Sequence, residues 1–372
     1  MHLKEGNIVR IFREFTPNWF TVGMGTGIVA LDAFLLPNGP LWLKSFGTDL
    51  WLFNIVLVGI FSVLLLGRAL FDRAGFQAVM HHPVQSMFFG AIPMALTTLV
   101  NGFINMGPAL LGAQSLIWAR DLWVVNTLVA FASVILVPFY MFTRHQHRLD
   151  TMTAVWLMPI VPAEVVAASA GSLLPHLAKS TQHLLFIGTV TLWAFSVPLA
   201  FLLLGILFLR LTLHKLPPRE MAISTWISLG TLGTGVMGMV GLGTDSRMLF
   251  PGWGTTLMGA AWLTALVLWG FGIWWFVQSL LITLYYRWRE PIPFNLGWWG
   301  LTFPLGVFTG GTDLLYHAFN IPVFRTLSIG FFGLLTIFWL LVAGRTLNGL
   351  IRSAVRTLST RETSEPDEEA VS

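Results

Sequence analysis

Four acidic residues lie in or just after long apolar runs, where an ionisable side chain is best placed to do chemistry: they are Asp32, Glu164, Asp245 and Asp313. A charge in such a run is costly, so an ionisable residue there is by default a functional candidate. For the three aspartates we favour hydrogen bonds to exposed backbone groups. Two roles stay open for Glu164: a protonatable group that couples anion movement to protons, or a hydrogen-bond partner for backbone groups freed near neighbouring prolines.

Hydroxyl groups are the second chemical resource, in every second apolar run from the first one onward, and the interiors of these runs contain no Lys or Arg. Threonine hydroxyls and freed backbone N–H groups can solvate an anion weakly, as fast turnover requires, whereas a buried lysine would hold it too tightly. Some threonines will hydrogen-bond to their own helix instead. The hydroxyls are those of Thr21, Thr26, Thr97, Thr98, Thr225, Thr231, Thr234, Thr302 and Thr309. We take Thr26, Thr97, Thr234 and Thr302 as the candidates for anion solvation.

The sequence does not indicate a metal site, a cofactor site or an enzyme active site. Because the chain contains no cysteine, disulfides, thiolate metal sites and cysteine nucleophiles are excluded. The glycine-rich GMGTGIVA (23–30) has no preceding strand, so it fails as a phosphate-binding loop. The histidines of HH (81–82) and TRHQH (143–147) fall in basic loops, which favours solvated turns over a metal site. An integral-membrane enzyme would need clustered His or carboxylate residues at one membrane face, and the spans offer no such cluster.

Membrane-spanning helices are the elements that must position these residues. Only 10% of the 372 residues are charged and 55% are apolar, whereas a soluble domain carries roughly a quarter charged residues. A span needs roughly 20 mostly apolar residues. We therefore predict an all-α integral membrane protein with ten transmembrane helices, at about 17–36, 49–67, 84–104, 116–142, 152–174, 181–209, 221–243, 253–286, 296–318 and 326–351.

The basic residues predict how the chain is oriented in the membrane. Of the 21 Lys and Arg residues, 16 fall in one alternating set of segments and 5 in the other. The positive-inside rule then places both termini in the cytoplasm. The same loops account for the sequence pI near 9.8, so nucleic acid is not an expected partner. We expect a multi-pass protein of the inner or plasma membrane, in contact with lipid.

Helix-breaking residues recur at a nearly constant spacing in every second predicted span. Gly25, Pro93, Pro162, Gly233 and Pro304 are 68, 69, 71 and 71 residues apart, which indicates an internal repeat. Five helical hairpins in a quasi-fivefold arrangement follow, with an inner ring of five kinked helices around a pore. Breakers at membrane depth are tolerated only against protein or a wet cavity. The alternative is that the small residues are packing devices and that no pore exists.

The residue before each breaker is apolar in all five repeats. These residues are Met24, Ile92, Val161, Leu232 and Phe303. If they point at a common axis, they form a hydrophobic constriction that gates by dewetting. Phe303 is the largest of them and is the predicted pore gate, although a phenylalanine near a kink is often ordinary packing.

The two ends of the chain differ from the spans in composition. Residues 1–16 mix apolar and basic residues, and we expect either a short interfacial helix or a solvated cytoplasmic leader. Residues 352–372 end in TRETSEPDEEAVS, an acidic stretch for which we predict a disordered cytoplasmic tail.

Three motifs and the repeat resemble one known family. WFTVGMGTG (19–27), MPIVPAEVVAASAG (158–171) and WWGLTFPLG (298–306) are similar to segments of the tellurite-resistance/dicarboxylate transporter family, over residues 17–350. That family includes malic-acid permeases, sulfite efflux pumps and slow anion channels. The resemblance implies a ten-helix, quasi-fivefold fold, a homotrimer with one pore per subunit, and a pore-blocking phenylalanine that corresponds to Phe303. The glycine in GMGTG, where three of the other four repeats have proline, predicts a straighter first helix.

We accordingly predict a transporter or channel for small anions, gated by Phe303 and with Glu164 as the candidate for proton coupling. A C4-dicarboxylate such as malate or succinate is the first expected substrate. The alternative is efflux of sulfite or another inorganic anion, such as nitrate or chloride. The direction of transport depends on gradients that the sequence does not contain.

Overall fold

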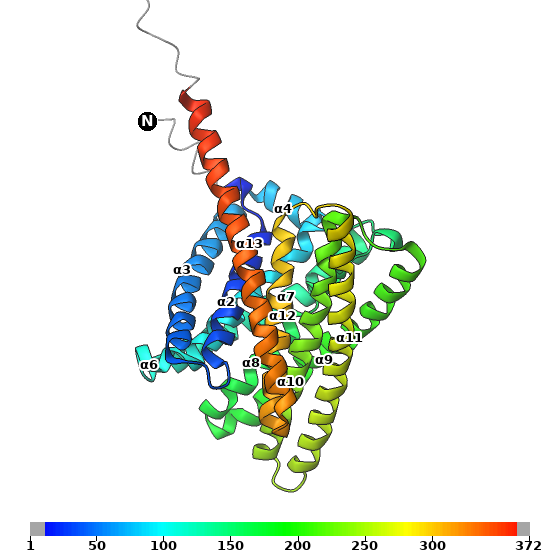
Figure 1. The fold of residues 1–372 in the computed structure, drawn as a ribbon. Helices are drawn as coiled ribbons and strands as arrows, with labels where there is room; N and C mark the ends of the chain where they lie inside the picture. Colours follow the sequence, from blue (N-terminus) through cyan, green and yellow to red (C-terminus); the bar gives the residue numbers. More distant parts are fainter. Residues whose placement is uncertain (1–11, 363–372) are drawn as a thin grey trace, which may run out of the picture.

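Short and long helices alternate along the chain in the computed structural model, which describes residues 12–362 (Figure 1). The short helices are α2 (Phe20–Leu35), α5 (Ala91–Asn105), α8 (Pro162–Leu173), α10 (Ser228–Leu249) and α12 (Phe303–Phe319). Each leads into a long helix, and these are α3 (Leu41–Phe71), α7 (Gln114–Thr143), α9 (Lys179–His214), α11 (Gly254–Arg289) and α13 (Pro322–Glu362). The connections hold the small helices α4 (Arg73–His81) and α6 (Gly107–Leu111), and the described residues contain no strand.

Seven helical segments of the described chain are long and apolar enough to cross a membrane. They match seven of the predicted spans. The other three, 17–36, 152–174 and 296–318, contain α2, α8 and α12, whose α-helical parts are only 16, 12 and 17 residues long. Since a crossing needs roughly 20 apolar residues, length and composition establish seven spans, and the ten-span arrangement is a proposal that we take up below.

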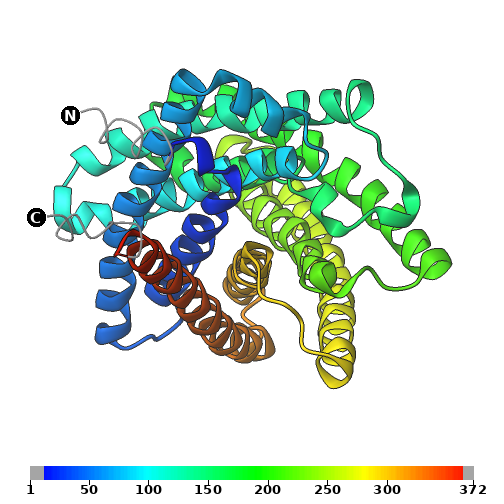
Figure 2. The same cartoon turned by 90° about the horizontal axis from the view of Figure 1, so that it is seen from above.

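The short helices pack against one another in a closed sequence of contacts. α2 contacts α5, α5 contacts α8, α8 contacts α10, α10 contacts α12, and α12 returns to α2. Seen from above, α12 lies between α2 and α10 (Figure 2). Each long helix packs on the outside of this set, and its exposed residues are largely apolar, as on the lipid-facing side of a membrane helix.

A 3₁₀ segment precedes each short helix: η1 (Pro17–Trp19), η2 (Gln85–Gly90), η4 (Ala154–Leu157), η6 (Arg219–Ile227) and η7 (Leu296–Leu301). Pro93, Pro162 and Pro304 all fall within the first three residues of their α-helices. Proline is well tolerated there because the first N–H groups of a helix have no intrahelical acceptor. The chain therefore changes from 3₁₀ to α geometry near these prolines, and the change lies at the helix start.

Gly25 and Gly233 differ from the expected kinks, because α2 and α10 run uninterrupted through them. Both glycines instead permit close contact with the segment around α12. A Cβ on Gly25 would lie 2.2 Å from Thr302 Oγ1, and a Cβ on Gly233 would lie 2.5 Å from the backbone nitrogen of Phe308. At these two positions glycine allows close packing because it has no side chain, and the helix is not broken.

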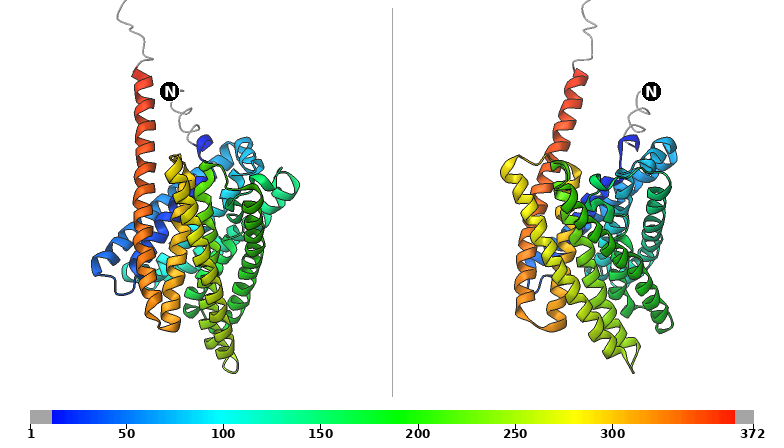
Figure 3. Two further views of the ribbon diagram at one scale, coloured as in Figure 1. Left: turned by 45° about the vertical axis from the view of Figure 1, so that its right-hand side comes forward. Right: turned by 90° about the vertical axis from the view of Figure 1, so that its right-hand side faces the viewer.

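The chain ends are described only in part. Residues 1–11 and 363–372 lie outside the described residues, so most of the predicted leader (1–16) and the last part of the predicted acidic tail (352–372) are not addressed. α13 continues as helix to Glu362, beyond the expected end of the last span at residue 351. In both views of Figure 3 its C-terminal part projects past the other helices.

Candidate functional site

Three cavities follow one another along the inside of the short helices, and all five repeats contribute to each of them. The N-end cavity, of about 230 Å³, lies at the N-terminal ends of the short helices. The central cavity measures about 10 Å³. The C-end cavity, of about 280 Å³, lies toward the C-terminal ends. Met24, Met158 and Ile227 line both the N-end and the central cavity, so these two are neighbours.

The central cavity is the narrowest part of this series, and its lining contains no polar side chain. It is lined by Met24, Met94, Met158, Val161, Ile227, Gly230, Phe303 and Pro304. A cavity needs at least about 10–15 Å³ to hold one water molecule. The central cavity therefore admits at most a single water, and a hydrated ion cannot pass it in this conformation.

Three of the five residues predicted for a hydrophobic constriction meet here, namely Met24, Val161 and Phe303. Ile92 and Leu232 line none of the three cavities. At the central cavity, Met94 lies where Ile92 was expected and Gly230 lies where Leu232 was expected. Each replacement lies two residues along its helix, and two residues correspond to a rotation of about 200° about the helix axis. Aligning the breakers gave the right height but not the rotation of α5 and α10.

Two further methionines of the lining, Met94 and Met158, were not predicted from the sequence. Met24, Met94 and Met158 come from three different repeats and surround the central cavity together with Phe303. A signal was present, because GMGTG, GAIPMALTT and MPIVPAE each contain a methionine close to the breaker. Methionine is unbranched and flexible, so this wall is able to change shape without breaking polar contacts.

Close approach of α2 positions the segment that carries Phe303. A Cβ on Gly25, which would lie 2.2 Å from Thr302 Oγ1, would also lie 2.7 Å from the ring of Trp299. Gly306 is equally tight, because a Cβ there would lie 2.4 Å from Ile28 Cγ1. These two glycines let α2 and α12 pack closely enough to bring Met24 and Phe303 to the same small cavity.

The four threonines chosen as anion-solvating candidates are buried and line none of the three cavities. Thr97 donates to Pro93 O (2.9 Å) and accepts from Asn126 Nδ2 of α7 (2.8 Å). Thr26 accepts from Trp339 Nε1 of α13 (3.3 Å). Their hydroxyls thus join inner to outer helices.

Thr302 and Thr234 are likewise engaged in the protein. Thr302 donates to Trp299 O (2.7 Å), and Thr234 donates to Gly230 O (2.7 Å) and contacts Glu164. Among the hydroxyls noted in the sequence, Thr21 lines the N-end cavity and Thr309 the C-end cavity. These two are placed to meet a solute.

Glu164 is fully buried between α8, α9 and α10, away from the three cavities. Its Oε1 accepts a hydrogen bond from Thr234 Oγ1 at 2.9 Å. The hydroxyls of Ser196 on α9 and Thr231 on α10 lie close to the same carboxyl group. The carboxyl group therefore meets side-chain hydroxyls rather than backbone freed near the prolines, and proton coupling stays a prediction.

The C-end cavity is acidic. Asp32 of α2 and Asp313 of α12 both line it, and His317 lies 3.6 Å from Asp313. Asp32 Oδ2, Asp313 Oδ1 and Asn101 Oδ1 are buried and accept no hydrogen bond from the described residues. We had favoured hydrogen bonds from these aspartates to exposed backbone groups. Asp32 and Asp313 instead line the cavity. Asp245 is buried elsewhere, with Oδ2 3.4 Å from where a Cβ of Gly171 would lie.

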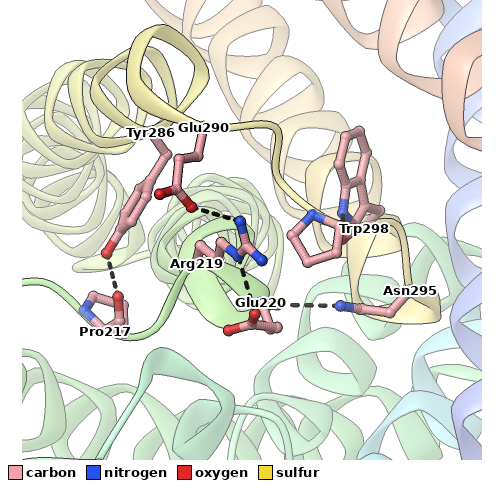
Figure 4. A network of polar contacts seen from close by, with 8 residues as sticks. Pro217, Arg219, Glu220, Tyr286, Glu290, Asn295 and Trp298 are labelled. Atoms are coloured by element: carbon pink, nitrogen blue, oxygen red, sulfur yellow. Dashed lines mark hydrogen bonds and ion pairs between the residues drawn. The ribbon is translucent and has the colours of Figure 1, made fainter.

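A polar network fixes the segment that leads into η7 and Phe303 (Figure 4). Arg219 Nη1 lies 2.5 Å from Glu290 Oε2, which ties the start of η6 to the end of α11. Asn295 donates to Glu220 O (3.1 Å) and accepts from the backbone nitrogen of Gly297 (2.8 Å), capping η7. Trp298 Nε1 donates to Pro293 O (2.9 Å).

Comparisons with known proteins agree with the family resemblance of the sequence. A family model described as "SLAC1: Voltage-dependent anion channel" matches residues 14–347. A protein named sulfite efflux pump SSU1 from Trichophyton rubrum is 36% identical over 344 residues, covering 90% of each chain. An uncharacterized transporter of Methanocaldococcus jannaschii is 29% identical, covering 91% of this chain and 94% of its own. The malic acid transport protein of Schizosaccharomyces pombe is 22% identical, over 78% of this chain and 68% of its own.

Proposed function

The chain belongs to the family of voltage-dependent anion channels and related transporters, and on that premise we propose that it conducts a small inorganic oxyanion, sulfite or hydrogen sulfite, through the axis of its short helices. The family consists of channels and transporters rather than enzymes, which agrees with the expectation from the sequence. Membership also agrees with a multi-pass membrane protein.

The observation that carries this proposal is the line of three cavities closed at one apolar point. Wide cavities with polar residues lie on both sides, and a space of about 10 Å³ around Phe303 separates them. From Phe303 to Thr309 at the C-end cavity is six residues, or about 9 Å along a helix. A short apolar barrier between two larger cavities with polar lining residues is the arrangement of a pore that gates by dewetting.

We propose the ten-span, quasi-fivefold arrangement as the architecture behind this axis. The closed contacts of the five short helices and the presence of all five repeats in each cavity support it. In that arrangement α2, α8 and α12 cross the membrane together with the 3₁₀ segments that precede them. We keep the homotrimer implied by the family resemblance as a further prediction, which mass measurement of the detergent-solubilised protein would check.

We place the N-end cavity and both termini on the cytoplasmic side of the cell membrane. The predominant set of basic residues supports this orientation, since Arg68, Arg144, Arg219 and Arg287 all lie at that end of the helices. The five 3₁₀ segments that precede the short helices begin there. The N-terminal end of a helix carries partial positive charge and free N–H groups that favour anions, so the cytoplasmic mouth attracts the substrate that an efflux protein exports.

Sulfite is better supported as substrate than the C4-dicarboxylate that we first expected. The relatives named as sulfite efflux pumps reach 36% identity over 90% of the chain, whereas the malic acid transport protein reaches 22% over 78%. A C4-dicarboxylate is therefore our second candidate. Nitrate and chloride belong in the same test, because weak solvation by N–H groups and hydroxyls does not choose strongly among monovalent anions.

A flux panel in proteoliposomes tests the substrate. The purified full chain is reconstituted, and efflux of sulfite, malate, succinate, nitrate and chloride is measured under a fixed gradient at two pH values. We expect sulfite to move fastest, at least tenfold above protein-free vesicles. Malate flux that exceeds sulfite flux would reverse the order of our two candidates, and no flux of any anion would contradict transport.

A further inference from the structure

A separate cavity lies on the outside of the bundle, between the cytoplasmic ends of α11 and α13. It measures about 390 Å³, and Ile223 is the one lining residue that it shares with the N-end cavity. Leu284 of α11 and Phe338 and Leu341 of α13 form its walls, and Ile223 and Leu301 of the inner 3₁₀ segments line it as well. Leu281 and Leu340 on the same two helices are exposed, so the surface of α11 and α13 near the cavity is apolar, as expected for a surface that faces lipid.

Two arginines stand at the mouth of this cavity. Arg287 is the third residue from the end of α11, and Arg345 lies on α13, so each helix contributes one arginine to the lining. Both are exposed, and no described carboxylate forms an ion pair with either. The guanidinium of Arg345 lies 4.9 Å from the ring centre of Trp298. Two uncompensated positive charges above an apolar cleft match the chemistry of an anionic lipid.

We propose that an anionic phospholipid of the cytoplasmic leaflet binds in this cleft, with an acyl chain between α11 and α13 and its phosphate between Arg287 and Arg345. Basic pockets between membrane helices on the cytoplasmic side are suited to anionic head groups. Arginine binds phosphate in a forked, two-bond geometry. The apolar walls select a lipid over a soluble anion, because a free phosphate would leave them facing water.

The cleft also connects to the segment that carries the predicted gate. Trp298 and Leu301, which line it, belong to η7, and η7 leads directly into Phe303. The other side of the same segment is held by the Arg219–Glu290 pair and by Asn295 (Figure 4). A lipid in the cleft therefore packs against η7 and restrains the start of α12. Anion flux should then change with the fraction of protein that has lipid bound in the cleft.

Native mass spectrometry of the detergent-solubilised full chain tests the binding, with phosphatidylglycerol and phosphatidylcholine of identical acyl chains as probes. We expect a clear preference for phosphatidylglycerol. The double variant Arg287→Gln/Arg345→Gln should reduce that preference by about fivefold for each arginine removed. The matched control Arg144→Gln/Arg289→Gln removes two exposed charges outside the cleft and should retain the preference. Equal retention by both double variants would overturn the proposal.

A second variant leaves both charges in place and fills the cleft. Leu284→Trp should lower the binding of both lipids, because the acyl chain loses its space. Unchanged binding of phosphatidylglycerol in this variant would contradict an acyl chain between α11 and α13. Flux provides an independent reading: it should depend on phosphatidylglycerol in the parent protein and lose that dependence in the double arginine variant, whichever anion is carried.

Two other occupants are separated in the same experiments. If inorganic phosphate or sulfite displaces phosphatidylglycerol at equal concentration, the site holds a soluble anion and the lipid assignment is wrong. If a second copy of the chain covers the cleft, Leu284→Trp should lower the mass of the assembly in the same spectra. Such a loss of mass would refute the lipid site.

Discussion

Replacing Phe303 with alanine should turn the closed axis into an open one. The phenyl ring lines a space of about 10 Å³, and every neighbour of that space is apolar. An anion that enters it is stripped of nearly all its water, and the effective penalty for taking an ion out of water inside a protein is several kcal/mol. The barrier is therefore highest at Phe303, where no polar side chain replaces the lost hydration.

The size of the increase in flux depends on how much of the anion's hydration is recovered in the variant. Truncation to alanine leaves room for water molecules to accompany the ion past Met24 and Val161. If about 2.7 kcal/mol of the desolvation penalty is recovered, the rate rises about 100-fold, since each 1.36 kcal/mol corresponds to a factor of ten. The assay is sulfite efflux from proteoliposomes of equal protein content, with the folded state checked by thermal unfolding.

Phe308 provides the matched control for loss of a phenyl ring. It lies on the same helix and is fully buried, but it stacks on Trp269 of α11 and packs against Gly272, away from the central cavity. Both substitutions should destabilise the protein by about 3–5 kcal/mol, and only Phe303→Ala should raise flux. Equal flux in the two variants, or no rise in a folded Phe303→Ala protein, would refute the gate.

Three further predictions concern residues around the axis. Gly25→Ala places a Cβ 2.2 Å from Thr302 Oγ1, so we expect destabilisation of about 1–3 kcal/mol from overpacking, measured as a lower unfolding temperature; the open position Gly259, with no atom near its Cβ site, is the control that should tolerate alanine. Glu164→Gln removes the one titratable group buried beside Thr234, and it should flatten the pH dependence of flux; an unchanged pH profile would exclude proton coupling at this residue. The double variant Asp32→Asn/Asp313→Asn removes the negative charge that this pair of carboxyl groups carries in the C-end cavity, and it should speed anion uptake from that side about fivefold, as expected for loss of roughly 1 kcal/mol of repulsion; an effect that persists in high salt would argue against a charge mechanism.

Much of the architecture was predictable from composition and spacing. So few charged residues cannot cover a water-facing surface, so the membrane setting follows from the sequence alone. The regular spacing of Gly25, Pro93, Pro162, Gly233 and Pro304 predicted five related segments at one height. Met24, Val161 and Phe303 do meet at the central cavity, because the spacing along a helix fixes how deep a residue lies.

Rotation about each helix axis was decided only by tertiary packing. Each residue turns a helix by about 100°, so a small difference in where α5 and α10 begin replaced Ile92 and Leu232 by Met94 and Gly230 at the cavity. Packing also turned Thr97 toward Asn126 and Thr26 toward Trp339, away from any solute. Cavities lined by distant segments, such as the one shared by Asp32 and Asp313 and the one shared by Arg287 and Arg345, depend on how helices assemble around one another, and no local pattern of residues encodes them.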